Sequence, residues 1–165
     1  MTKNAELLCP ELEKEVTPEV VLFVCTGNTC RSPMAAALFN HLYGSESRRA
    51  TSAGLFAAGE PISKNAIVAL TDRGVPVTES NDYTSHVSVG VSEEALKTAA
   101  LVVGVTSSHA MQLIMRYPAY ASKIAVMPSD ISDPYGGDEE DYKRCLCDIE
   151  KALSVAFGNA EETEA

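Results

Sequence analysis

Apolar and polar positions alternate along the chain in blocks that are typical of strands and helices in turn. Residues 20–24 form an uninterrupted apolar run of β-branched, aliphatic and aromatic side chains, and residues 100–105 and 123–127 have a similar composition. Such runs are typical of parallel strands that are buried on both faces. A further short strand is predicted over residues 48–52.

Segments with helical signals separate these runs. The clearest helix is predicted over residues 33–43, where Ser32 supplies an N-cap, Pro33 occupies the first helical position and Gly44 follows the end. Further helices are predicted over residues 63–73, 92–98, 107–117 and 139–157. Strands that alternate with helices indicate an α/β fold, in which helices cover both faces of a parallel sheet.

The 165 residues are enough for one domain with a single core. We assign residues 20–157 to this domain, preceded by an acidic extension (1–19) and followed by an acidic tail (158–165). Within the extension, residues 11–16 are either a short helix or mobile. Most of the net charge of −10 comes from the extension, the tail and residues 138–150, which is the ordinary property of a solvated surface.

Composition excludes several classes of function and location. The basic residues are dispersed, which argues against a nucleic-acid partner, and no apolar run is long enough to span a membrane. The N-terminus lacks the apolar block of a signal peptide, and the five cysteines do not have the spacing of a disulfide framework. A cytoplasmic location is therefore predicted. Cys145 and Cys147 have no second ligand pair nearby, so neither a metal nor another cofactor is expected.

The candidate reactive segment follows the first strand. It covers residues 25–32, with the sequence Cys-Thr-Gly-Asn-Thr-Cys-Arg-Ser, and it can both bind an anion and supply a nucleophile. A loop that joins a strand to a helix N-terminus presents free backbone amides to an anion, and Gly27 lets the backbone curve so that these amides converge. Arg31 supplies a planar fork that matches two phosphate oxygens. The same surroundings stabilise a thiolate at Cys25, which becomes a nucleophile toward a bound phosphoryl group.

A leaving group also needs a proton donor. The preferred general acid is Asp133, in the sequence Asp-Pro-Tyr-Gly-Gly after the strand predicted at 123–127. Parallel strands end at one edge of the sheet, so this loop should lie near Cys25. Asp130 is the competitor, and its alternative role is to cap a helix or a turn.

These motifs resemble those of the low-molecular-weight protein tyrosine phosphatase family over roughly residues 20–157. The resemblance implies the phosphotyrosine protein phosphatase I-like fold, a four-stranded parallel sheet flanked by helices. It implies that Cys25 forms a phosphocysteine intermediate, that Arg31 binds phosphate, and that Asp133 acts as acid and then as base. It implies a phosphate-binding loop of Thr26, Gly27, Asn28, Thr29, Cys30, Arg31 and Ser32, and loop support from Asn28, Ser32, Ser52 and His86.

The resemblance also implies a redox role for the second loop cysteine. Cys30 can trap an oxidised Cys25 as a disulfide before irreversible oxidation, and its alternative role is that of a small buried residue. The walls of the substrate slot are assigned to Leu55, Phe56 and Tyr135. His41 and His109 are interpreted as structural.

The substrate class depends on Thr29. Tyrosine-directed members mostly carry a larger aliphatic residue at this position, whereas protein arginine phosphatases of the family carry Thr. Phosphoarginine on a protein is therefore favoured, with phosphotyrosine as the alternative, although Tyr135 stands where arginine-directed members tend to have Phe.

Arsenate reductases share the fold but use a further cysteine pair, and residues 92–105 contain no cysteine. A non-catalytic phosphoprotein-binding module would lack Cys25 or Asp133. The oligomeric state is not predicted.

Overall fold

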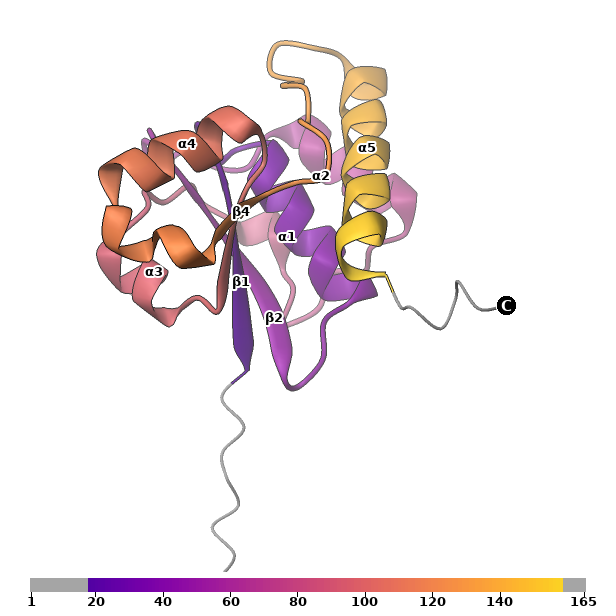
Figure 1. Ribbon diagram of the computed structural model, residues 1–165. Helices are drawn as coiled ribbons and strands as arrows, with labels where there is room; N and C mark the ends of the chain where they lie inside the picture. Colours follow the sequence, from indigo (N-terminus) through magenta and orange to yellow (C-terminus); the bar gives the residue numbers. More distant parts are fainter. Residues whose placement is uncertain (1–17, 159–165) are drawn as a thin grey trace, which may run out of the picture.

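The computed structural model describes residues 18–158, which form a layered α/β structure (Figure 1). The predicted alternatives for residues 11–16 and nearly all of the predicted extension and tail lie outside the described residues.

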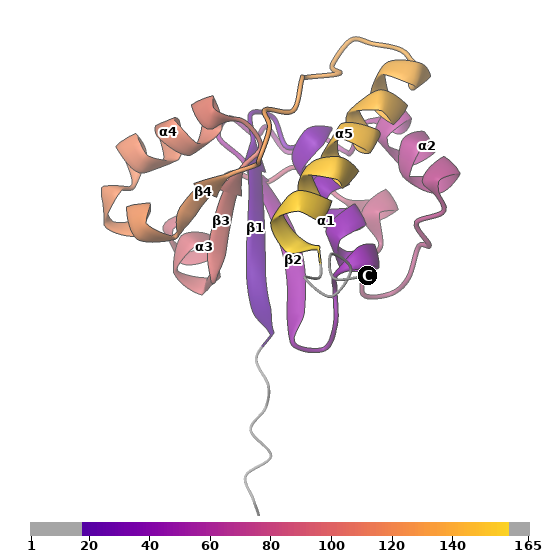
Figure 2. The ribbon, with the colours of Figure 1, turned by 45° about the vertical axis from the view of Figure 1, so that its right-hand side comes forward.

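A four-stranded parallel sheet lies at the centre, in the order β2-β1-β3-β4. Its strands are β1 (Glu19–Cys25), β2 (Arg48–Gly54), β3 (Leu101–Gly104) and β4 (Ile124–Val126). All β1 residues after Glu19 are buried, because β2 and β3 flank this strand and helices cover both of its faces (Figure 2). The predicted α/β class and the parallel sheet are confirmed.

The helices are α1 (Arg31–Leu42), α2 (Lys64–Arg73), α3 (Glu93–Thr98), α4 (Ser107–Arg116) and α5 (Glu139–Phe157). In Figures 1 and 2, α3 and α4 cover one face of the sheet, and α1, α2 and α5 lie on the other. Because strand side chains alternate between faces, Phe23 belongs to the larger core cluster beneath α1 and α5, and Val24 belongs to the smaller cluster beneath α3 and α4. None of the helices within residues 18–158 is long and apolar enough to cross a membrane.

Two predictions about these elements were wrong, and two short helices were missed. The strand predicted as buried at 123–127 is the short edge strand β4, in which Ala125 and Val126 are exposed. Within residues 18–158 it pairs with β3 alone. An apolar run does not reveal whether its strand will have one neighbour or two. Helix α1 begins at Arg31, with Cys30 rather than Ser32 at the N-cap position. The short helices η2 (Tyr83–Ser85) and η3 (Pro118–Lys123) were not predicted.

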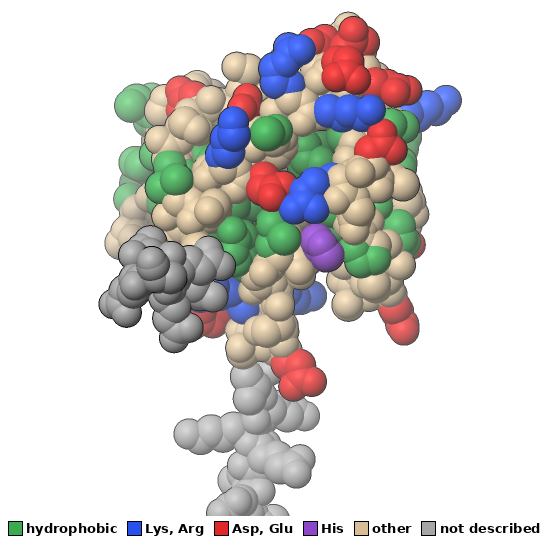
Figure 3. Space-filling model, turned by 90° about the vertical axis from the view of Figure 1, so that its right-hand side faces the viewer, with side chains coloured by type: hydrophobic (Ala, Val, Ile, Leu, Met, Phe, Trp, Pro, Cys, Tyr) green, Lys and Arg blue, Asp and Glu red, His purple; other side chains and the backbone are tan. Residues whose placement is uncertain are grey.

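The surface that carries α2 and α5 shows basic and acidic side chains interspersed (Figure 3). Arg73 pairs with Glu150 at 2.6 Å, and Lys143 pairs with Asp72 at 3.0 Å, which joins the two helices. These exposed pairs contribute little to stability individually, so the packing of the apolar faces is what fixes α5 against α2.

The end of β2 holds the loop that follows β1. Gly54 pairs with Cys25 in the sheet, and beyond it the amides of Leu55 and Phe56 donate to the carbonyls of Cys25 and Thr26, each at 2.9 Å. A Cβ atom at Gly54 would lie 2.7 Å from the Thr26 carbonyl oxygen, so only glycine allows this close approach. Strand β2 therefore supports the loop directly.

We expect Gly54→Ala to destabilise the fold and to displace this loop. The added Cβ would also lie 2.9 Å from Asn28 Cβ, which forces the backbone to move. The expected loss in the free energy of unfolding is about 1–3 kcal/mol, the usual range for overpacking, measured by denaturant titration. Gly90→Ala is the matched control, because a Cβ there meets no atom within 4 Å. Equal losses in both variants would contradict this explanation.

Candidate active site

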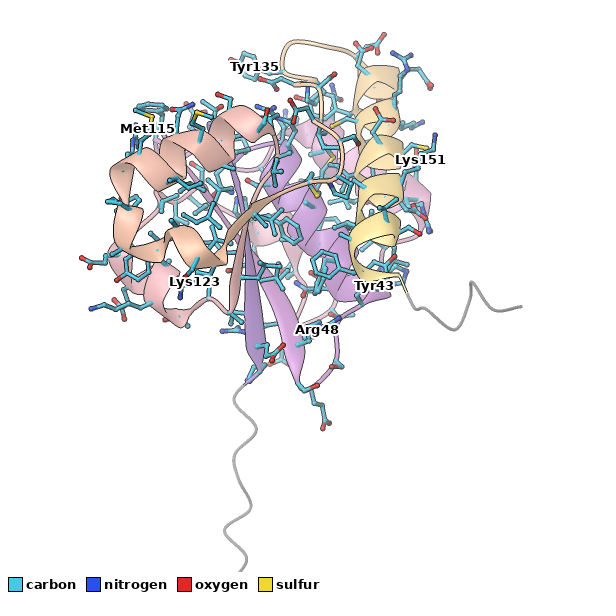
Figure 4. All side chains as sticks on the ribbon, in the orientation of Figure 1. Tyr43, Arg48, Met115, Lys123, Tyr135 and Lys151 are labelled. Atoms are coloured by element: carbon cyan, nitrogen blue, oxygen red, sulfur yellow. The ribbon has the colours of Figure 1, made fainter. Side chains whose placement is uncertain are left out.

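The site lies at the carboxyl end of β1, where the chain turns into α1. In open α/β sheets ligands bind at this edge. The loop of residues 25–30 forms its floor, α4 begins on one side, and the loop between β4 and α5 passes over the same edge with Tyr135 at its outer part (Figure 4).

Cys25 is the last residue of β1, and its side chain is buried at the floor of the loop. Its Sγ lies 2.9 Å from Ser32 Oγ and accepts a hydrogen bond of 3.3 Å from the Asn28 amide. A hydroxyl and a backbone N–H directed at one sulfur stabilise a thiolate, the form of cysteine that attacks an electrophile. The contact with Cys25 occupies the Ser32 hydroxyl, which explains why it does not cap α1.

Asn28 organises the loop from its centre. It is fully buried and adopts φ 59°, a left-handed conformation that Asn tolerates better than most residues. Its Nδ2 donates to Ser32 Oγ at 2.8 Å and to Ser52 Oγ at 3.0 Å, while its Oδ1 accepts from the Val89 amide at 3.0 Å. The Asn28 carbonyl accepts from His86 Nε2 at 2.9 Å, so this ring nitrogen carries a proton. The structure thus brings together the four residues predicted to support the loop.

Arg31 begins α1 and is almost completely buried. Its Nη1 donates to the Ile131 carbonyl at 3.1 Å, and its Nη2 lies 3.5 Å from Asp133 Oδ2. The first contact fixes the guanidinium, and the second places it beside a carboxylate whose side chain is 54% exposed. A buried cation and an accessible carboxylate therefore face each other at the rim of the loop.

The two aspartates after β4 differ in their contacts. Asp130 accepts hydrogen bonds from the Ser107 amide at 2.8 Å and the Ser107 hydroxyl at 3.1 Å, so it caps the start of α4. Asp133 bonds through Oδ1 to the Tyr135 amide at 3.1 Å and directs Oδ2 toward Arg31. Of these two residues, Asp133 is the one with a carboxylate oxygen beside Arg31.

Cys30 is buried, with its Sγ 3.2 Å from Tyr142 Oη on α5 and 3.6 Å from Thr29 Oγ1. Burial and the contact with Cys30 raise the pKa of Tyr142 to about 12, so its hydroxyl remains protonated near neutral pH. The thiol is thus held by packing and by a hydroxyl. Its proposed disulfide with Cys25 stays a prediction.

The three residues predicted to form the substrate wall differ in exposure. Leu55 is buried in the smaller core cluster, so its side chain is not available to a large substrate. Phe56 is 62% exposed, and the Arg116 guanidinium lies 4.6 Å above its ring. Tyr135 is 79% exposed. Two aromatic rings, rather than three apolar side chains, are therefore open to solvent near the loop.

The sequence analysis missed the contact that His109 makes with the loop. The ring is buried at the start of α4, and its Nε2 lies 2.9 Å from Thr26 Oγ1. The pattern Thr106-x-x-His109 forms a capping box directly after β3, the strand that neighbours β1. That capping pattern was the signal that could have placed His109 near Cys25.

Within residues 18–158, no three His, Cys, Asp or Glu side chains gather as a metal-binding group. Cys145 is buried and Cys147 is exposed, so they face different sides of α5. The arrangement at the loop instead combines the Cys25 thiol, the Asn28 amide directed at it, a guanidinium fixed by the Ile131 carbonyl and the Asp133 carboxylate. These groups together can transfer a phosphoryl group to sulfur.

Comparisons with known proteins agree with this chemistry. The profile of the family described as low molecular weight phosphotyrosine protein phosphatase matches residues 20–162. A protein-arginine-phosphatase of Geobacillus stearothermophilus is 36% identical over 82% of this chain and 92% of its own length. Low molecular weight protein-tyrosine phosphatase A of Mycobacterium tuberculosis is 33% identical over 82% of this chain and 88% of its own length.

One solved structure bears on the intermediate. It is a mutant of the YwlE arginine phosphatase in which a serine replaces the active-site cysteine, and this serine is phosphorylated. Its TM-score to the present structure is 0.73, with 31% sequence identity over 81% of this chain and 90% of that one.

We expect Asn28→Ala to destabilise the protein more than Asn28→Gly. Both variants lose the hydrogen bonds of the side chain, but the positive φ of this position is strained for alanine and unstrained for glycine. The expected loss of unfolding free energy for Asn28→Ala is about 2–4 kcal/mol, and the glycine variant should recover about 1 kcal/mol of it. Denaturant titration measures both. An alanine variant as stable as the unmodified protein would show that Asn28 does not hold the loop.

Proposed function

The chain belongs to the low molecular weight phosphotyrosine protein phosphatase family, and we propose that its preferred substrate is phosphoarginine on proteins. As a member of this family it is a cysteine-dependent enzyme that hydrolyses phosphorylated protein side chains. The substrate preference and the role of each residue are the parts that we propose.

In the first half of the reaction, Cys25 Sγ attacks the phosphorus atom of the bound substrate. The S–P bond forms while the P–N bond of phosphoarginine breaks, and Asp133 gives its proton to the leaving nitrogen. The loop amides and Arg31 stabilise the charge on the phosphoryl oxygens. The phosphorylated serine in the related structure supports a covalent intermediate at this position.

In the second half, water attacks the phosphocysteine, and Asp133, now a carboxylate, takes a proton from this water. The S–P bond breaks, and inorganic phosphate leaves while Cys25 returns to the thiolate. The separation of 3.5 Å between Arg31 Nη2 and Asp133 Oδ2 supports these roles, because it puts the carboxylate beside the group that binds the phosphate.

The observation that carries the substrate preference is the polar residue Thr29 inside the loop, in a chain 36% identical to a protein-arginine-phosphatase. The Thr29 hydroxyl lies in the loop, where it can accept a hydrogen bond from a guanidinium N–H or orient the attacking water. The same rim carries Asp133, which is placed to protonate the leaving nitrogen.

Phosphotyrosine is the second candidate, and the exposed aromatic rings favour it. Phe56 and Tyr135 can pack against an aromatic leaving group, and the related tyrosine phosphatase A is 33% identical. An arsenate reductase is disfavoured, because residues 92–105 contain no cysteine to relay electrons.

We also infer a cytoplasmic location. Cys25 must remain reduced to act as a nucleophile, and reducing compartments preserve such thiols.

Substitution of Thr29 tests the substrate preference. We expect the unmodified protein to have a higher kcat/KM on a phosphoarginine peptide than on the matched phosphotyrosine peptide. Thr29→Ile and Thr29→Val should lower the phosphoarginine value about tenfold, because each removes a hydrogen bond to a charged group, whereas Thr29→Ser should retain it. Equal or better turnover of phosphoarginine by Thr29→Ile would rule out this assignment.

Paired substitutions of the two aspartates test the general acid. With an aryl phosphate substrate, Asp133→Asn should lower kcat by about 100-fold or more, the usual contribution of acid–base catalysis. Asp130→Asn should retain kcat and lose about 1 kcal/mol of unfolding free energy as a weakened helix cap. A larger loss of kcat in Asp130→Asn than in Asp133→Asn would reverse the two roles.

A further inference from the structure

A buried histidine contacts the active-site loop without being part of the reaction described above. His109 is 4% exposed and occupies the third position of α4. Its ring lies between two threonines, Thr106 at the N-cap of α4 and Thr26 directly after Cys25. The contact with Thr106 is part of the capping box of α4, and the contact with Thr26 connects the ring to the active-site loop.

The hydrogen bonds of the ring determine which nitrogen carries the proton. His109 Nδ1 lies 3.2 Å from the Thr106 amide nitrogen and 2.9 Å from Thr106 Oγ1. A backbone N–H can only donate, so Nδ1 accepts and is unprotonated. In a neutral ring the single proton is then on Nε2.

The surroundings keep the ring neutral. Burial and the positive charge of Arg31 lower the pKa of His109 to about 4, and the charges of Asp133 and Asp130 only partly oppose this shift. Arg31 faces the ring from α1, and the two aspartates face it from the loop after β4. Near neutral pH, Nε2–H is therefore a donor in a fixed position.

The recipient of this proton is the Thr26 hydroxyl. His109 Nε2 and Thr26 Oγ1 are 2.9 Å apart, and among the described residues Thr26 Oγ1 makes no other hydrogen bond. Because the oxygen accepts from His109, its own O–H cannot point at the ring and must be directed elsewhere. Thr26 is exposed at the rim of the loop, so its hydroxyl proton is available to a bound molecule.

We propose that His109 is a positioning residue that fixes the Thr26 hydroxyl as a hydrogen-bond donor to a phosphoryl oxygen of the substrate. The side chain of Thr26 then adds to the site a neutral donor that is separate from the loop amides and from Arg31. An orientation fixed before binding avoids the entropic loss that a freely rotating hydroxyl would suffer. The proposal applies whether phosphoarginine or phosphotyrosine is the preferred substrate, because both present the same phosphoryl oxygens.

The test measures the inhibition constant of inorganic phosphate, together with kcat/KM on an aryl phosphate. Thr26→Val keeps the shape and removes the hydroxyl, so it should weaken phosphate inhibition by about tenfold, the size of a hydrogen bond to a charged group. Thr26→Ser keeps the hydroxyl and should retain phosphate inhibition.

Two substitutions of His109 separate positioning from packing. In His109→Gln the side-chain carbonyl can accept from the Thr106 amide, as in a capping box, and the amide nitrogen can donate to Thr26. This variant should therefore retain phosphate inhibition. His109→Phe fills the same space without a donor and should weaken inhibition as much as Thr26→Val. In the double variant His109→Phe/Thr26→Val, the loss should equal that of Thr26→Val alone.

Two results would overturn the proposal. One is phosphate inhibition of Thr26→Val equal to that of the unmodified protein, which remains decisive if His109→Phe does not fold. The other is an independent, additive loss in the double variant, which would show that His109 does not act through Thr26. Because inorganic phosphate carries no leaving group, either result leaves the phosphoarginine preference unaffected.

Discussion

Asn28 is the residue on which the geometry of the site depends. Its side chain is buried, and each polar atom of its amide group has a partner: Ser32, Ser52 and the Val89 amide. A buried polar group without partners would be strongly destabilising. The left-handed backbone of Asn28 therefore persists because three other segments hold it, and the curvature that it gives the loop directs its own amide at Cys25.

The other side chains at the site take their places from the ends of three strands. Strand β1 delivers Cys25, the beginning of α4 after β3 delivers His109, and the segment after β4 delivers Asp133. Arg31 links this last segment to the loop, because it donates to the Ile131 carbonyl and lies beside the Asp133 carboxylate. A phosphate bound on the loop would thus contact groups whose positions are already set by the sheet.

Much of this could be predicted from the sequence, because its signals are local. The apolar run of β1 and the ends of α5 are visible in consecutive residues. The nucleophile and the arginine of the site both lie within residues 25–32, so the loop could also be recognised from a single segment. Other features depend on partners that are distant along the chain. The exposure of β4 depends on its place at the edge of the sheet. The burial of Leu55 depends on its place in the smaller core cluster, and the contact of His109 with the loop depends on strand order. For Ser32 the sequence predicted both an N-cap of α1 and support of the loop. In the folded protein its hydroxyl contacts Cys25 and does not cap the helix.

The central claim is that Cys25 carries the phosphoryl group during turnover. Intact-protein and peptide mass spectrometry can test it after the Asp133→Asn variant is mixed rapidly with an aryl phosphate that has a good leaving group. Without Asp133 to activate water, the intermediate should accumulate as one phosphoryl group on Cys25, together with a burst of released alcohol. A burst with the phosphoryl group on another residue, or release of alcohol with no phosphorylated protein at any time, would contradict the claim.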